Sequence, residues 1–197
     1  LETSSVIKQA NDNFYTSNLA SYTNYIDTDA GFCGDRSTLN LQNGVGTGTV
    51  TTYNKGYLRV STSAPSLICE NASDLYTVSS SSKGNKALTY PIGLITADEV
   101  MLSGSNGGVF DGSYNYQKPT SNSYITTGNN FWTMTPAGGY YPFGGTLWGA
   151  YMFFVGVSGS IDDDGASAPY GLRPVINIRS DVRVSGDGTM ASPYIFS

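Results

Sequence analysis

Residues 90–100, Tyr90-Pro-Ile-Gly-Leu-Ile-Thr-Ala-Asp-Glu-Val100, combine a short apolar segment with the start of a helix. The apolar part, residues 90–95, predicts a short buried strand or extended segment. Thr96 and Glu99 then fit a capping box, in which the threonine hydroxyl caps the first turn and the carboxylate three residues on reaches back. The helix is predicted to end at Ser103-Gly104, so this stretch already indicates a chain of mixed helix and strand.

The chain before this stretch divides into a helical part and a turn-rich part. Apolar residues recur at helical spacing near the N-terminus, where residues 3–5 are all serine or threonine and can cap the start. The predicted apolar stripe consists of Val6, Ile7, Ala10, Phe14 and Leu19. A second short helical piece is predicted at residues 20–27. From Gly31 to Leu58 turn residues are frequent, which predicts loops with short strands such as residues 48–53.

The last third of the chain is predicted to form strands. Residues 131–135 alternate large and polar side chains, and apolar runs follow at 151–157 and 172–178. A final pair of short strands, 182–184 and 193–196, brackets a Gly-Asp-Gly turn. The chain contains neither an internal repeat nor a linker-like segment, so the sequence predicts a single α+β domain over residues 1–197.

The charge balance of the chain argues against several classes of function. The 197 residues include only 10 Lys and Arg against 15 Asp and Glu, a net charge of −5, which cannot supply the basic surface that nucleic acids require. Histidine is absent, which removes histidine-based catalysis and most zinc sites. No apolar run reaches the roughly 20 residues of a membrane span, so we expect no membrane insertion by this segment.

Cys33 and Cys69 are the only two cysteines. Two cysteines without histidine cannot build a structural zinc site, so they form either one disulfide or two buried thiols. The scarcity of Lys and Glu, the abundance of Tyr, Ser, Thr and Gly, and the glycosylation sequon Asn71-Ala72-Ser73 are typical of extracellular proteins. We therefore expect an extracellular location, on a cell surface or a virion.

Residues 131–172 are unusually aromatic and contain no Lys, Arg, Glu, Gln, Asn or His. The aromatic residues of this window are Phe131, Trp132, Tyr140, Tyr141, Phe143, Trp148, Tyr151, Phe153, Phe154 and Tyr170. The part from Ala137 to Gly149 holds too many glycines for a regular strand, which predicts a loop that carries aromatic rings. Such a loop is either a binding surface or a lid that covers the sheet.

Candidate metal and catalytic groups are few. The run Asp162-Asp163-Asp164-Gly165 is either a source of oxygen ligands for a hard cation or an acidic turn between two strands. It lacks EF-hand spacing, so no metal site is predicted. Capping of a helix explains the adjacent acids Asp98 and Glu99, and Asp35-Arg36 is typical of a buried ion pair that fixes a turn. With no histidine and no motif for a carboxylate pair or a Ser-Lys dyad, we expect no enzyme activity and no cofactor.

Five blocks of sequence carry a resemblance to a known family. They are Gly31-Phe-Cys-Gly-Asp-Arg-Ser37, the stretch 90–100, Phe131-Trp-Thr-Met-Thr-Pro136, Gly171-Leu-Arg-Pro-Val-Ile-Asn-Ile178, and Gly186-Asp-Gly-Thr189 followed by Ser192-Pro-Tyr194. In this order they resemble prokaryotic and viral surface domains with a C-type-lectin-like fold, related to the fold of formylglycine-generating enzymes. Some members of this family are the variable proteins of diversity-generating retroelements, whose C-terminal region is hypermutated to vary ligand binding.

The resemblance implies a C-type-lectin-like α+β fold with two helices early, a small twisted antiparallel sheet in the C-terminal half, and long loops. The paired catalytic cysteines of formylglycine-generating enzymes have no counterpart in residues 131–178, so the resemblance implies binding and not oxidation. Adenine-directed mutagenesis of Asn codons yields residues such as Tyr, Phe, Thr and Asp, but not Lys, Glu, Gln, Met or Trp. Trp148 falls outside this reachable set and is expected to be a framework residue.

The predicted function is therefore a non-enzymatic ligand-binding display protein on a virion or cell surface, with a variable region at residues 137–170. The expected ligand-binding residues are Tyr140, Tyr141, Phe143, Thr146, Trp148, Tyr151, Asp162, Asp163 and Asp164. The expected partner is a protein or glycan ligand on another cell or particle. The alternative is an invariant structural or pilus-like surface domain without a selected ligand.

Overall fold

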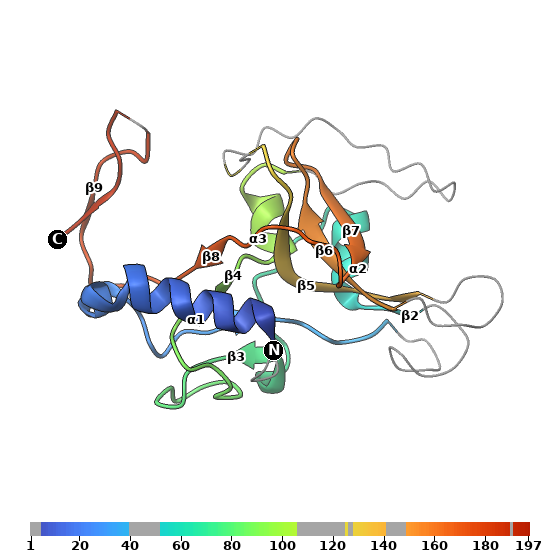
Figure 1. Ribbon diagram of the computed structural model, residues 1–197, viewed down its shortest axis with the longest axis horizontal. Coiled ribbons are helices and arrows are strands. Elements are labelled where there is room, and N and C mark those ends of the chain that lie inside the picture. The colour runs from blue at the N-terminus through green and yellow to red at the C-terminus, as the bar shows by residue number, and fades with distance from the viewer. Residues whose placement is uncertain (1–4, 40–51, 106–124, 126–127, 141–148, 190) are drawn as a thin grey trace. The chain divides into compact units, whose positions relative to one another are not determined.

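The structure is a computed structural model that describes residues 5–39, 52–105, 125, 128–140, 149–189 and 191–197 (Figure 1). The chain forms two compact units, each assembled from separate segments. The first unit consists of Leu1–Gly31, Tyr76–Gly93 and Pro174–Ser197, and the second consists of Phe32–Leu75 and Leu94–Arg173. The described part contains helices and antiparallel strands, which confirms the prediction of a mixed α and β chain.

A four-stranded antiparallel sheet forms the frame of the second unit. Its strands are β2 (Thr52–Tyr53), β5 (Phe131–Tyr140), β6 (Gly149–Val155) and β7 (Ile161–Gly165), in the order β2-β5-β6-β7. Figure 1 shows β5, β6 and β7 side by side. The pairing of β5 with β6 runs from Phe131↔Val155 to Tyr140↔Gly149. The strands predicted at 131–135 and 151–157 are therefore present, the first longer than predicted and the second beginning and ending two residues earlier.

One face of this sheet packs against two helices to form the core of the second unit. The helices are α2 (Lys55–Ser61) and α3 (Ala97–Leu102). The buried members of this core are Val60, Ala97, Val100, Met101, Phe131, Ala137, Phe153, Val155 and Ile161. Burial of these side chains is the main stabilising contribution, at about 1.5–3 kcal/mol for each large aliphatic or aromatic side chain.

The α3 helix begins with the predicted capping box. The Thr96 hydroxyl accepts a hydrogen bond of 3.1 Å from the Glu99 backbone N–H, and the Glu99 carboxylate accepts one of 2.7 Å from the Thr96 backbone N–H. The helix is capped at its other end by Ser103, after which Gly104 adopts a φ of 99°. Glycine reaches this conformation without steric cost, so the helix ends where the sequence predicts.

The glycines at positions 138 and 139 lie inside strand β5, which corrects the prediction of a loop from Ala137 onward. Gly138 is paired with Tyr53 of β2, and a Cβ atom at position 138 would lie 2.4 Å from the carbonyl oxygen of Thr52. The glycine therefore permits the close approach of β2 to β5. Glycine in a strand often marks such a contact between backbones, and here it extends the strand.

The α2 helix was missed by the prediction, which assigns residues 31–58 to loops and short strands. The sequence Asn54-Lys55-Gly56 is typical of a turn, but Asn54 occupies the N-cap position of the helix, without a side-chain capping bond, and Gly56 lies inside it. A Cβ atom on Gly56 would lie 2.5 Å from the Thr135 methyl carbon and 3.2 Å from the Pro136 carbonyl oxygen. The glycine is present because the helix packs closely on β5, and its helix propensity is secondary to this contact.

The first unit contains the N-terminal helix α1 (Val6–Asn18) and the 3-10 helix η1 (Ala20–Tyr25). Ser5 caps α1 by accepting a hydrogen bond of 3.1 Å from the backbone N–H of Lys8. Strands β9 (Val184–Ser185) and β10 (Ile195–Phe196) pair in antiparallel fashion around the predicted Gly-Asp-Gly turn. These elements confirm both predicted early helical segments and the final pair of strands.

The predicted apolar stripe of α1 is half-buried at Ile7, Ala10 and Leu19, but it is not the buried face of the helix. Val6 is 80% exposed and Phe14 is 42% exposed, whereas Lys8, Asn11 and Tyr15 are buried. Lys8 can be buried because its ammonium group donates to Asp12 at 2.5 Å and to Thr89 at 2.6 Å. The Tyr15 ring stacks on Tyr90 with ring centroids 4.8 Å apart. Tertiary contacts therefore override the apolar periodicity of this helix.

The remaining elements are short. They are β1 (Phe32–Cys33), η2 (Ala72–Asp74), β3 (Leu75–Tyr76), β4 (Gly93–Leu94) and β8 (Pro174–Val175). The strands predicted over residues 90–95 and 172–178 are thus reduced to two residues each, and the other residues of these segments are extended or irregular.

Candidate functional site

The predicted binding segment is bracketed by two adjacent strand ends. Tyr140 is the last residue of β5 and lies opposite Gly149, the first residue of β6. Four of the predicted binding residues, Tyr141, Phe143, Thr146 and Trp148, lie outside the described residues. The chain thus leaves β5 at Tyr140 and enters β6 at Gly149, and these two residues are paired in the sheet. The residues on either side of the segment 141–148 are therefore held next to each other.

Tyr151 lies within β6 and not on a loop. It is partly buried and packs against the core of the second unit. Its neighbours across the sheet are Gly138 on β5 and Gly165 on β7, neither of which has a side chain. Because Tyr151 packs against the core, part of this predicted binding residue belongs to the scaffold.

The three aspartates 162–164 lie in strand β7, which corrects the prediction of an acidic turn. Their partners on β6 are Phe154, Phe153 and Met152, respectively. Because side chains alternate between the faces of a strand, Asp162 and Asp164 share one face and Asp163 lies on the other. β7 is at the edge of the sheet, where charged side chains hinder pairing with another sheet edge.

This alternation also separates the three carboxylates, so they do not form one ligand cluster. Within the described ranges, no group of three or more His, Cys, Asp or Glu residues is arranged to hold a metal ion. The sequence alternatives for the run, a cation site or a turn tip, both rest on a bend in the chain that is absent from β7.

An aromatic cluster covers the face of the sheet that carries Asp162 and Asp164. Trp132 and Phe154 are buried, and the Tyr170 ring lies on both, with centroid distances of 4.8 Å to Trp132 and 4.5 Å to Phe154. The Tyr170 hydroxyl donates a hydrogen bond of 2.7 Å to Oδ2 of Asp164. This bond, together with burial, raises the pKa of Tyr170 above its ordinary value.

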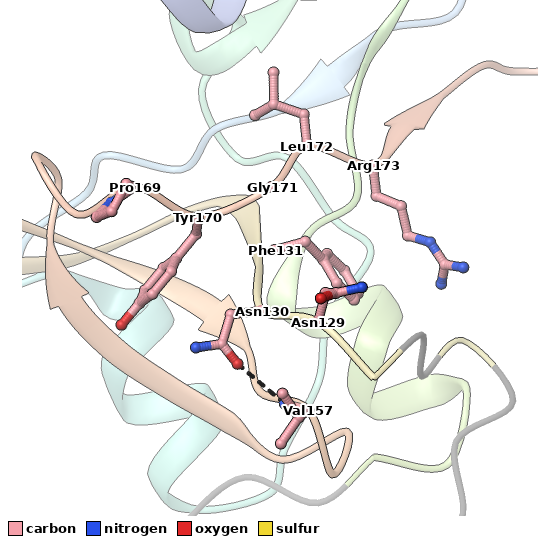
Figure 2. Close-up of a pocket in the computed structure, with 9 residues that line it drawn as sticks. All are labelled: Asn129, Asn130, Phe131, Val157, Pro169, Tyr170, Gly171, Leu172 and Arg173. Atoms are coloured by element: carbon pink, nitrogen blue, oxygen red, sulfur yellow. Dashed lines mark hydrogen bonds between the residues drawn. The ribbon is translucent and has the colours of Figure 1, made fainter.

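Next to this cluster lies a hollow of about 600 Å³, formed by the second unit alone (Figure 2). The lining residues are Asn129, Asn130, Phe131, Val157, Pro169, Tyr170, Gly171, Leu172 and Arg173. Gly171 anchors one wall to the start of β5, since its carbonyl accepts from Trp132 N–H and its own N–H donates to the Asn130 carbonyl, both at 3.0 Å. A site of this size is within the range of small-molecule pockets.

Asn130 holds a second wall of this pocket. Its Oδ1 accepts a hydrogen bond of 3.1 Å from the backbone N–H of Val157. The Asn130 side chain also lowers the pKa of Tyr170, against the larger upward effect of Asp164. Two separate hydrogen bonds therefore hold this side of the pocket, one between Val157 and Asn130 and one between Tyr170 and Asp164.

Arg173 supplies the positive charge of the pocket. Its guanidinium carbon lies 5.2 Å from the centroid of the Phe131 ring, a cation–π contact, and its Nη1 donates to the carbonyl of Ile125. Within the part of the chain that the structure describes, no carboxylate forms a salt bridge with Arg173. In Figure 2 the side chains of Tyr170 and Arg173 lie on opposite sides of Phe131.

Neither Tyr170 nor Arg173 was predicted as a site residue. The sequence placed Tyr170 in the aromatic window and Arg173 in a block of family resemblance, but no spacing links either residue to residues 129–131. The contact depends on a return of the chain along β5, which is seen as the bridge between Phe131 and Gly171. Sequence periodicity carries no signal for such a return.

The ion pair predicted between Asp35 and Arg36 does not form. Asp35 instead accepts from Arg59 at 2.8 Å, and Arg36 pairs with Asp74 at 2.7 Å. Burial alone would raise the pKa of Asp35, but hydrogen bonds from Arg59 and Ser37 outweigh it and hold the pKa below its ordinary value. Adjacent residues point in different directions in this extended segment, so each finds its own distant partner.

Asp98 also has a role beyond helix capping. Arg59 donates to both of its carboxylate oxygens, at 2.7 and 3.1 Å, and the backbone N–H of Ser66 donates at 2.9 Å. Asp35, Arg59 and Asp98 therefore form a buried charge cluster that connects α2, α3 and the segment around Asp35. Each charged group in it is bound to an opposite charge, an arrangement typical of structural ion pairs.

Cys33 and Cys69 are joined in a disulfide, with Cα atoms 5.7 Å apart. The two buried thiols considered as the alternative are therefore not present. The bridge closes a sequence separation of 36 residues within the second unit. Both cysteines therefore have a structural role.

The described helices include none that is both long enough and apolar enough to cross a membrane. In comparisons with protein-family models, with curated protein sequences and with solved structures, no match to this chain was found.

Proposed function

We propose that this chain is a non-enzymatic ligand-binding display protein of a virion or cell surface, with a C-type-lectin-like fold and a binding segment that a diversity-generating retroelement varies. The observation that carries the proposal is the register pair Tyr140↔Gly149. It fixes both ends of residues 141–148 on a sheet whose core is packed by α2 and α3. Antibodies use a similar arrangement, in which a packed sheet positions the segments that bind the ligand.

The composition of the segment supports a role in recognition. Residues 140–148, Tyr-Tyr-Pro-Phe-Gly-Gly-Thr-Leu-Trp, combine large aromatic rings with glycine and a hydroxyl group and contain no charge. Tyr and Trp provide a large contact area at a low cost in conformational entropy, which makes them frequent in binding loops. A protein or a glycan on another cell or particle is the partner class that such a surface fits.

The disulfide supports an extracellular location. Disulfides persist in oxidising compartments and are rare where glutathione and thioredoxin keep thiols reduced. The Cys33–Cys69 bridge lies in the same unit as the sheet that holds the proposed binding segment. A display protein outside the cell needs such stabilisation, because its binding residues contribute contact area and not core packing.

Four of the described aspartates, which could otherwise serve as catalytic acids or bases, are hydrogen-bonded to the side chain of a partner. Asp35 and Asp98 are bound to Arg59, Asp74 to Arg36 and Asp164 to Tyr170. In each case the carboxylate accepts a hydrogen bond from the side chain of its partner. These pairings favour binding over catalysis.

Sequencing of the gene in many clones of one source population tests the proposal. We expect substitutions at the codons for residues 140, 141, 143 and 146, restricted to amino acids reachable from mutated Asn codons, and an unchanged Trp148 and Gly149. A reverse transcriptase gene next to a near-copy of the region for residues 131–175 should accompany them. An invariant region without that neighbouring gene would contradict the proposal and favour a structural or pilus-like surface domain.

A further inference from the structure

The pocket beside Tyr170 has the properties of a second binding site, separate from residues 141–148. Its walls come from residues 129–131, Val157 and residues 169–173, all in the second unit. The hollow of about 600 Å³ is large enough for a small organic ligand. The inference drawn from it goes beyond the proposed function, because it concerns a different set of residues and a different class of ligand.

Arg173 determines the charge that the pocket prefers. A guanidinium group carries five N–H donors. One of them is used by the carbonyl of Ile125, and the face of the group lies on the ring of Phe131. The side chain is half-buried, and among the described residues no acidic side chain neutralises it. An incoming anion can therefore form charge-assisted hydrogen bonds with the remaining donors.

The hydroxyl of Tyr170 does not compete with Arg173 for an anion. Tyr170 donates its only O–H to Asp164, and Oδ1 of Asn130 accepts from the backbone N–H of Val157. The bond to Asp164 leaves the ring of Tyr170, together with Pro169, as apolar surface in the walls. The pocket thus joins one cationic group to a preformed apolar and aromatic lining.

The surrounding charges favour a ligand with a single negative charge. The chain as a whole carries a net charge of −5. The Asp164 carboxylate lies one hydrogen bond away from a lining residue, at 2.7 Å from the Tyr170 hydroxyl. One guanidinium can balance one carboxylate, whereas a phosphate dianion would leave a second charge in a region that is already negative.

We infer that this pocket binds a small monocarboxylate with an apolar or aromatic body, whose carboxylate is held by Arg173 and whose body lies against Pro169 and Tyr170. The alternative is that Arg173 only stabilises the fold by its contacts with Phe131 and Ile125. The two readings differ in one respect: only a binding site distinguishes a carboxylate from its neutral amide.

The test uses 3-phenylpropionate and 3-phenylpropionamide as probes on the unaltered protein. Titration is followed by the ¹H–¹⁵N shifts of the backbone amides of Trp132, Val157 and Gly171, which flank the pocket. We expect saturable shifts with the carboxylate and about tenfold weaker binding of the amide, the loss expected for one charge-assisted hydrogen bond. Equal binding of the two probes, or the absence of saturable shifts with either, would overturn the inference.

Substitution of the arginine provides the second arm. Arg173→Gln should bind the carboxylate and the amide with equal affinity, and Arg173→Lys should retain part of the preference as a point charge. Arg183→Gln removes an exposed arginine of the first unit and should leave binding unchanged. A preference that persists in a folded Arg173→Gln variant would overturn the inference. If that variant does not fold, the comparison of the two probes on the unaltered protein and on Arg173→Lys decides.

A third probe, 3-phenylpropylphosphonate, separates carboxylate from phosphate-like ligands. Its dianion should bind more weakly than the carboxylate near neutral pH, because a single guanidinium faces it. Tighter binding of the phosphonate would overturn the assignment to monocarboxylates. None of these outcomes bears on residues 141–148, so the proposed display function stands or falls separately.

Discussion

The hydroxyl of Tyr170 donates a hydrogen bond of 2.7 Å to Asp164, and the same tyrosine ring covers Trp132 and Phe154. Asp164 belongs to the edge strand β7, whereas Tyr170 belongs to the segment that returns along β5. One side chain therefore ties the edge of the sheet to its centre and forms a wall of the pocket. The first prediction concerns this bond.

Replacement of Tyr170 by Phe should lower the free energy of unfolding by about 1 kcal/mol, because it removes a hydrogen bond to a charged group and keeps the ring. Chemical denaturation near neutral pH measures this loss. Tyr194→Phe alters an exposed tyrosine, 60% accessible, and serves as the control. Equal stability of both variants would show that the Tyr170–Asp164 bond does not stabilise the fold.

The same bond gives the protein a dependence on alkaline pH. The pKa of Tyr170 is raised in the folded state, first by the bond to Asp164. A raised pKa means that the bond stabilises the fold fully below about pH 10, the unfolded value, and that this contribution is lost as pH rises through the folded value. Burial also raises the pKa of Tyr15, so absorbance titration of tyrosinate should show late-titrating groups, one of which disappears in Tyr170→Phe. An unchanged titration curve in the variant would contradict the assignment.

The disulfide should be one of the largest single contributions to stability. Closure of a loop with a separation of 36 residues contributes about 4 kcal/mol in the chain-entropy model. Thiol titration of the unfolded, unreduced protein should detect no free thiol, and the double variant Cys33→Ala/Cys69→Ala should unfold at a lower denaturant concentration. Two titratable thiols would show that the protein is not bridged in solution.

Gly138 and Gly165 offer a matched pair of strand glycines. Alanine at 138 would place its Cβ 2.4 Å from the Thr52 carbonyl oxygen, whereas alanine at 165 would meet nothing nearer than Ser167 Oγ at 4.0 Å. Gly138→Ala should therefore cost roughly 1–3 kcal/mol through a forced separation of β2 from β5, and Gly165→Ala should be tolerated. Thermal melts of the two variants measure the difference. Equal melting temperatures would mean that β2 does not pack on β5 as described.

The Arg59 cluster predicts a large effect from a charge substitution. Arg59→Met would leave Asp35 and Asp98 buried without their partner, at a cost of roughly 3–5 kcal/mol. Lys55→Met, which breaks the exposed pair with Glu70, should leave stability nearly unchanged, because solvent screens exposed ion pairs. Denaturation of both variants in the same buffer tests the contrast, and similar losses in the two would contradict a buried cluster.

This cluster also predicts a loss of stability in acid. The pKa of Asp35 is depressed in the folded state, so its contribution is present above the unfolded value, near pH 4, and is lost as pH falls through the folded value. Unfolding measured from pH 6 to pH 2 should show this loss, and Asp35→Asn should reduce its slope. A slope that is unchanged in the variant would assign the acid sensitivity to other carboxylates.

The sequence predicts those features that depend on neighbouring residues. The capping box of Thr96 and Glu99, the Ser5 cap and the strands around Phe131 and Phe153 follow from local spacing, and the structure contains them. The features that were missed depend on distant contacts. Gly56 and Gly138 are turn residues by composition, and only the close approach of another backbone explains them inside a helix and a strand.

The same reason explains the charged and aromatic residues that were misplaced. Asp162–Asp164 show no apolar alternation, so nothing in the sequence reveals that they form an edge strand. Lys8 and Tyr15 are buried on α1 because Thr89 and Tyr90 meet them from a remote segment. The pocket requires residues 129–131 and 169–173 to meet, a pairing that local patterns cannot predict.

The most direct test of the binding segment compares the stability of three alanine variants. Trp132 is 4% exposed, so Trp132→Ala should cost roughly 3–5 kcal/mol as a core truncation. If the rings that follow β5 serve recognition, Tyr140→Ala and Tyr141→Ala should each change the free energy of unfolding by less than about 0.5 kcal/mol. Losses of the Trp132 size at both tyrosines would show that these rings form a packed lid, and would contradict a recognition surface at this end of the sheet.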